Sequence, residues 1–170
     1  MSTLNNIRLL LLASWLGAAI FFSAAVAPSA FGVLRGFNLI NAGEIAGAIV
    51  NRTLSAVNTT GFVLSVLLLI SAFLLKESYG RRVFILQIVL LIIVAVTTGA
   101  GEWVIAAKMR GLRGAMRTPI DQIAAGDPSR VAFDALHGYS VTALSIAIIA
   151  ALVGFFVMAN RRKRDGESRY

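Results

Sequence analysis

The sequence predicts an all-α integral membrane protein, a bundle of four transmembrane helices. Apolar residues make up 58% of its 170 residues and the mean hydropathy is +0.80, which is far above the usual range of soluble domains. The apolar residues gather in four runs, each long enough to cross a hydrocarbon core, which takes about 20 helical residues. No run shows the alternation of a membrane β-barrel strand. Because backbone groups in lipid must be satisfied within their own segment, each run is expected to be a helix.

The four runs form one predicted domain, residues 1–160, followed by a basic cytoplasmic tail, residues 161–170. The spans are expected at about 9–33, 54–75, 83–107 and 138–159. With 170 residues and no cysteine, the chain suits a single unit without disulfides or thiolate metal sites.

Two connections carry helical patterns of their own. Residues 34–53 combine apolar and small residues, which predicts an interfacial helix that follows span one and leads into span two. After span three, "KMRGLRGAMR" predicts a helical extension that is interrupted at Pro119. Asp127 can cap a further helix with Pro128 at its first position, and this helix is expected to run into span four.

The distribution of lysine and arginine predicts the orientation in the membrane. With four spans both termini share one side, where Arg8 precedes span one, a short basic loop covers 76–82 and "RRKR" follows span four. Cytoplasmic loops carry an excess of these cations, so both termini are expected in the cytoplasm and the protein in the plasma (inner) membrane. The net charge of +8 therefore indicates the lipid bilayer as partner and no nucleic acid.

Most acidic residues fall at the other, non-cytoplasmic end, together with the single histidine. The predicted polar site there comprises Glu44, Glu102, Asp134, His137, Arg110, Arg113 and Arg130. Arg110 and Arg113 are three residues apart and share one helical face. Because arginines at this end run against the positive-inside tendency, pairing with the acids or with anionic lipid is the simplest reason for them.

Glu102 stands inside an apolar run, where a charge at the helix centre costs about 2.5–3.5 kcal/mol on insertion scales. It is expected to face the bundle and to find a partner there. One interpretation is a Glu–Arg pair that fixes the helix register near the interface. The other is a transport or binding role.

Asp134 and His137 share a helical face, with Arg130 one turn earlier. A carboxylate in this position can orient an imidazole, which would suit a proton-coupled or metal site. The alternative is an Arg130–Asp134 pair with His137 at the membrane interface. Met109 and Met116 together with His137 would suit Cu(I), but they form no recognised ligand motif, and no cofactor is expected.

Small and aromatic residues are interpreted as helix-packing positions. The predicted packing residues are Trp15, Gly17, Pro28, Gly43 and Gly47. Glycines allow helices to approach closely in a membrane, and a proline leaves an unbonded carbonyl that kinks a helix.

The segments "WLGAAIFFSAAVAPSAF", "AGEIAGAIVN" and "FDALHGYSV" resemble the bacterial relatives of the eukaryotic transmembrane protein 205 family, over about residues 10–158. The residues that carry the resemblance are Trp15, Gly17, Phe22, Pro28, Gly43, Glu44, His137 and Ser140. The resemblance implies a four-span domain whose biochemistry is largely open. It also implies a link to metal handling, through resistance to platinum drugs and a distant similarity to copper-resistance membrane proteins.

Three functional hypotheses follow. The first is a membrane protein that transports or handles a small solute or metal ion through the polar site, as a homo-oligomer because four helices are narrow for a conduction path. The second is an accessory protein in which the same residues hold the bundle and dock a partner protein or lipid. The third, an enzyme, is disfavoured, because the sequence has no Walker, HExxH, GxSxG or Rossmann motif.

Overall fold

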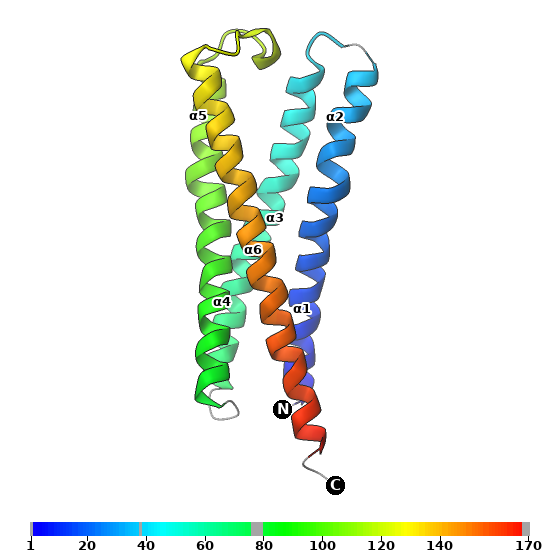
Figure 1. The fold of residues 1–170 in the computed structure, drawn as a ribbon, viewed down its shortest axis with the longest axis vertical. Helices are drawn as coiled ribbons and strands as arrows, with labels where there is room; N and C mark the ends of the chain where they lie inside the picture. Colours follow the sequence, from blue (N-terminus) through cyan, green and yellow to red (C-terminus); the bar gives the residue numbers. More distant parts are fainter. Residues whose placement is uncertain (1, 38, 76–79, 168–170) are drawn as a thin grey trace.

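Four long helices make up the protein and confirm the predicted fold class (Figure 1). The computed structural model describes residues 2–37, 39–75 and 80–167, and within these residues it contains helices and connections but no strand. The four helices that are long and apolar enough to cross a membrane are Thr3–Gly36, Ala42–Leu74, Arg81–Ala115 and Pro128–Asn160. Each contains one of the spans expected from the sequence, except that the predicted second span ends one residue beyond its helix.

The first long helix contains a π-helical turn directly before Pro28. Its segments are α1 (Ser2–Phe21), the π-helix η1 (Phe22–Val26) and α2 (Ala27–Gly36). Pro28 has no N–H and cannot bond the carbonyl four residues earlier. The Ala27 N–H instead donates to the Phe22 carbonyl, five residues back, as in a π-helix. The irregularity that the sequence predicts at Pro28 therefore takes the form of a wide turn in a continuous helix.

The second long helix, α3 (Ala42–Leu74), contains most of the helix expected over 34–53. As predicted, the chain from Ala42 onward leads into the second span, but residues 34–36 belong to the end of α2 and no break separates the segment from the span. The physical reason is that α3 contains no proline, so nothing interrupts its backbone hydrogen bonds. Glu44 in its first turn also stabilises the positive end of the helix dipole.

The third and fourth long helices begin and end close to the predicted positions. Their segments are α4 (Arg81–Gly99), the π-helix η3 (Ala100–Ala106), α5 (Ala107–Ala115), the 3-10 turn η4 (Ile120–Gln122) and α6 (Pro128–Glu167). Asp127 caps α6 as predicted, because its Oδ1 accepts the Ser129 N–H at 2.8 Å and its carbonyl accepts the Val131 N–H at 2.9 Å. The predicted tail, 161–170, continues α6 as far as Glu167, and residues 168–170 lie outside the described part.

The helices are arranged so that α4 packs against both α3 and α6, while α1 packs against α3 and α6 from the other side. Both termini lie at one end of the bundle (Figure 1). Toward the opposite end, which we call the distal end, α2 and α3 diverge from α5 and α6 (Figure 1). Large apolar side chains are exposed along all four long helices, as lipid contact requires.

A close contact in the core joins Trp15 of α1 to Gly61 of α3. Trp15 is 5% exposed, and its Nε1 donates to the Val57 carbonyl at 2.9 Å. A Cβ on Gly61 would lie 2.7 Å from the indole ring. The absence of a side chain at Gly61 therefore allows the indole to reach the backbone of α3.

Candidate functional site

A buried carboxylate lies in the irregular part of the third long helix. Glu102, within the π-helix η3, is 7% exposed. Its Oε1 accepts a hydrogen bond from Arg110 Nη1 at 3.3 Å, which is also an ion pair. Its Oε2 is buried and has no hydrogen-bond partner among the described residues. π-helical turns are rare, and they occur frequently at functional sites.

Polar side chains accompany Glu102 on the inner faces of α3 and α4. Thr98 lies one turn before it on the same face, and its hydroxyl donates to the Val94 carbonyl at 2.6 Å. Asn58 of α3 is buried against Gly101, where an added Cβ would lie 3.0 Å from Asn58 Nδ2. Glu102 therefore sits in a region that holds amide and hydroxyl groups inside the membrane-spanning part of the bundle.

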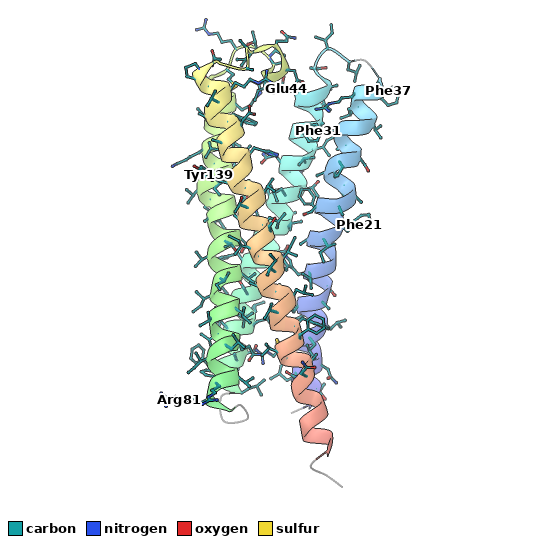
Figure 2. All side chains as sticks on the ribbon, viewed as in Figure 1. Phe21, Phe31, Phe37, Glu44, Arg81 and Tyr139 are labelled. Atoms are coloured by element: carbon teal, nitrogen blue, oxygen red, sulfur yellow. The ribbon has the colours of Figure 1, made fainter. Side chains whose placement is uncertain are left out.

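The second glutamate of the predicted site, Glu44, is paired at the distal end. Figure 2 shows Glu44 at the end of the bundle opposite Arg81. Arg113 Nη2 donates to Glu44 Oε1, and Arg113 Nη1 donates to the Thr118 carbonyl at 3.1 Å. Arg113 therefore connects α3, α5 and the segment after α5. Gly43 contributes to the same junction, because Asp121 occupies the place that a Cβ on Gly43 would need.

Arg130, Asp134 and His137 lie on α6, apart from the two glutamates. Arg130 Nε is 3.9 Å from Asp134 Oδ2, and Arg130 Nη1 donates to the Ile123 carbonyl at 2.6 Å. The Asp134 side chain is 65% exposed. His137 is also exposed and forms no hydrogen bond or ion pair with Asp134 or any other described residue. The Arg130–Asp134 pair is present in the structure, whereas the carboxylate-oriented imidazole is not.

His137 lies on the wall of a groove between α2, α3 and α6, which we call the α2–α3–α6 groove. Its volume is about 290 Å³, and its lining is mostly apolar, with Phe22 and Phe31 on one side and Leu144 on the other. Ser140, one turn after His137, also lines it and is buried. The predicted polar site is therefore divided: Glu44 and Glu102 meet two arginines of α5, and His137 faces a different space.

The metal-binding interpretation gains no ligand cluster from the fold. In the described part of the chain, no three His, Cys, Asp or Glu side chains gather as metal ligands. Met109, on α5, and Met116, at the C-terminal end of that helix, are not among the side chains that line the groove with His137. The three candidate copper ligands therefore do not share this groove.

The predicted packing residues have different environments. Trp15 and Gly43 are at close contacts, and Pro28 follows the η1 turn and lines the α2–α3–α6 groove. Gly17 and Gly47 differ from the prediction, because a Cβ on either would meet no atom within 4 Å. Both positions are open in a single chain, whereas a Cβ on Gly61, Gly99 or Gly101 would meet a neighbouring side chain.

Among the described residues, four buried polar side chains were not identified from the sequence as members of a site: Arg8, Asn58, Ser65 and Gln87. Arg8, which we placed among the cytoplasmic cations, is 1% exposed, and its Nη2 donates to the Leu68 carbonyl at 3.3 Å. Asn58 and Gln87 are also buried, and neither amide atom of Gln87 has a hydrogen-bond partner among the described residues. The sequence does contain a signal for two of them. Asn58 and Gln87 stand at or inside apolar runs, where a polar side chain tends to face the bundle.

Comparison with known proteins shows the family of the chain but assigns no activity. No curated protein and no solved structure matched the chain. The narrower resemblance to the transmembrane protein 205 family is not confirmed by the family match that was found. Residues 10–118 match the model of a domain of unknown function, DUF4149, and the chain therefore belongs to the DUF4149 family of uncharacterised proteins.

Proposed function

We propose that this multi-pass membrane protein binds and moves a small cation, a metal ion or an organic ammonium ion, at Glu102. The observation that carries the proposal is the buried Oε2 of Glu102, which has no hydrogen-bond partner in the part of the chain that the structure describes, while Oε1 pairs with Arg110. An acid held inside the membrane-spanning part of a bundle is expensive to keep and is commonly part of a substrate or ion pathway.

Arg110 provides a way for the site to open. Its side chain is 47% exposed, whereas that of Glu102 is 9% exposed. Arg110 can therefore exchange its carboxylate contact for water while Glu102 stays in place. A cation that enters would replace the guanidinium, with oxygen ligands from Glu102, Asn58 and Thr98. Oxygen ligands of this kind suit hard cations.

The role we propose is not enzymatic. The membrane and the orientation that we propose for the protein are those expected from the sequence. The protein would lie in the plasma (inner) membrane with both termini in the cytoplasm, so that Glu102 is nearer to the outer side. Four helices leave little room for a path through one chain. We therefore propose a homo-oligomer, with the exposed glycine Gly17 of α1 at the contact between copies.

The test is charge movement by the purified protein in liposomes on a solid-supported membrane. Concentration jumps of K⁺, Zn²⁺, Cu⁺ and ethylammonium would be applied in turn. We expect at least one of them to produce a current with the wild-type protein. Glu102→Gln should reduce that current about tenfold or more, because the amide lacks the charge that attracts the cation.

Glu44→Gln is the matched control, because it removes the other glutamate that pairs with an arginine of α5. It should keep the wild-type current. The proposal is wrong if none of the four cations moves charge through the wild-type protein. It is equally wrong if folded Glu102→Gln and Glu44→Gln give the same current.

A non-transport accessory role is the second candidate. The observation in its favour is that Arg113 joins α3, α5 and the following segment at the distal end, which is what a structural clamp does. In that case Glu102 and Arg110 would fix the helix register, and the bundle would serve a partner protein or lipid. Loss of co-purified partners without any change of charge movement in the Glu44→Gln variant would favour it.

A further inference from the structure

The α2–α3–α6 groove opens sideways, toward the space that lipid occupies. α2 packs against α3, and α1 packs against α6, but α2 and α6 diverge toward the distal end (Figure 1). The groove lies between them and is closed at its deep end by the buried residues Phe22 and Leu144. From Phe22 to Phe31 it extends about 13 Å along the helix axis, at 1.5 Å per residue.

The groove has a mostly apolar floor, where the hydroxyls of Ser23 and Ser145 donate to backbone carbonyls of their own helices, and it has polar groups without such bonds toward its distal end. Phe31 lines it, and the guanidinium carbon of Arg35 lies 5.8 Å from the centroid of the Phe31 ring. On the opposite wall are His137 and the buried Ser140, and neither side chain has a hydrogen-bond partner among the described residues. An occupant of this groove is therefore apolar along its length and polar at its distal end.

The charged residues at the distal end of the groove indicate whether the polar group of the occupant is negative or positive. Arg35 forms no ion pair with any described residue, whereas Arg130 is paired with Asp134. The unpaired positive charge thus lies beside Phe31. A phosphate group there could accept hydrogen bonds from the Arg35 guanidinium and from His137, which are strong when the acceptor is charged.

We propose that the α2–α3–α6 groove binds one anionic phospholipid of the leaflet at the distal end. One acyl chain lies along the floor between Phe22 and Phe31, and the phosphate lies near Arg35 and His137. The Ser140 hydroxyl is placed to donate to an ester carbonyl. The second acyl chain remains in the bilayer, since a volume of about 290 Å³ is at the lower limit of small-molecule sites.

A protein segment fits this space less well than a lipid does. A helix with its side chains is about 10–12 Å across, which a groove of about 290 Å³ cannot enclose. An extended strand would bring unpaired backbone groups into lipid. An alkyl chain has neither difficulty. The inference does not depend on cation transport, because Glu102 does not line the groove.

Lipid retention by the purified protein tests the proposal. The protein in detergent would be titrated with phosphatidylglycerol or phosphatidylcholine of identical acyl chains, and bound lipid would be counted by native mass spectrometry. We expect wild type to bind one phosphatidylglycerol about five- to tenfold more tightly than phosphatidylcholine, from the charged contact. Arg35→Gln should remove this preference, and Ala27→Phe, which fills the groove, should weaken binding of both lipids.

The controls separate the groove from the general surface. Arg52→Gln removes an exposed arginine of α3 from the face away from Val50 and Leu54, which line the groove, and should leave the preference unchanged. Ile92→Phe enlarges an exposed side chain of α4 and should also bind as wild type does. Equal binding of the two lipids by wild type would overturn the proposal. So would identical behaviour of Arg35→Gln and Arg52→Gln, or full lipid binding by folded Ala27→Phe.

Discussion

Replacing Gly61 with alanine is expected to lower the free energy of unfolding by about 2 kcal/mol, within the usual range for overpacked cores. The added Cβ would lie 2.7 Å from three atoms of the Trp15 ring, which is closer than real Cβ contacts come. The ring cannot easily move, because it is buried and its Nε1 is hydrogen-bonded to the Val57 carbonyl. Helix propensity alone would raise the free energy of unfolding, because it favours alanine over glycine by about 1 kcal/mol. The expected change for Gly61→Ala therefore has the opposite sign.

Gly47→Ala provides the matched control on the same helix. A Cβ there would meet no atom within 4 Å, so the single chain predicts no loss and a gain of up to about 1 kcal/mol. The measurement is the midpoint of unfolding by SDS in mixed micelles. If Gly61→Ala is as stable as Gly47→Ala, the contact between Trp15 and α3 is not as close as the structure has it.

A double-mutant cycle would assign the effect to the Trp15 ring. Trp15→Phe removes part of the ring and should itself destabilise, since it loses the bond to Val57. In that background Gly61→Ala should cost clearly less than in wild type, because the smaller ring leaves room for the Cβ. Additive effects would mean that the two residues do not interact.

Arg110→Met is expected to destabilise the protein by about 2 kcal/mol. It leaves the buried Glu102 carboxylate without the one cation that pairs with it among the described residues, and breaking a fully buried pair in this way costs about 3–5 kcal/mol. The smaller value applies because the Arg110 side chain is 47% exposed, so that water already screens part of the interaction. The measurement is again the SDS unfolding midpoint.

A second substitution should partly restore the stability of this variant. Adding Glu102→Gln replaces the unpaired charge with a neutral amide, so the double variant should be more stable than Arg110→Met alone. Arg117→Met is the control, because it removes an exposed arginine just beyond the end of α5 that forms no ion pair with any described residue. Equal effects of Arg110→Met and Arg117→Met would show that the pair with Glu102 contributes nothing to stability.

Helix positions were predictable from the sequence because apolar length and proline are local signals. The four spans, the cap at Asp127 and the irregularity at Pro28 all follow from residues close together in the chain. The pattern of residues 34–53 predicted a helix leading into span two, but it did not show where that helix begins, because an apolar, small-residue pattern does not mark a helix boundary.

The partners of the charged side chains were less predictable from the sequence than the positions of the helices. The sequence placed Glu44, Glu102 and the arginines at one end, but it could not determine which acid would meet which arginine. Helical spacing shows that Arg110 and Arg113 share a face, whereas the pairing with Glu102 and Glu44 depends on how α3 and α5 pack. His137 was grouped with these acids because of its position near Asp134, yet its side chain faces the α2–α3–α6 groove.

The sequence by itself determined the class of protein and the four spans, and it placed Glu44, Glu102 and the arginines that pair with them at one end of the bundle. Only the tertiary structure decided that Trp15 packs on Gly61, that Asn58 and Gln87 are buried, and that His137 is separated from Glu102. The physical reason is the solvent. In water an apolar stripe marks the face that turns inward, but lipid is as apolar as the core, so the hydropathy of a spanning helix does not reveal which face meets its neighbours.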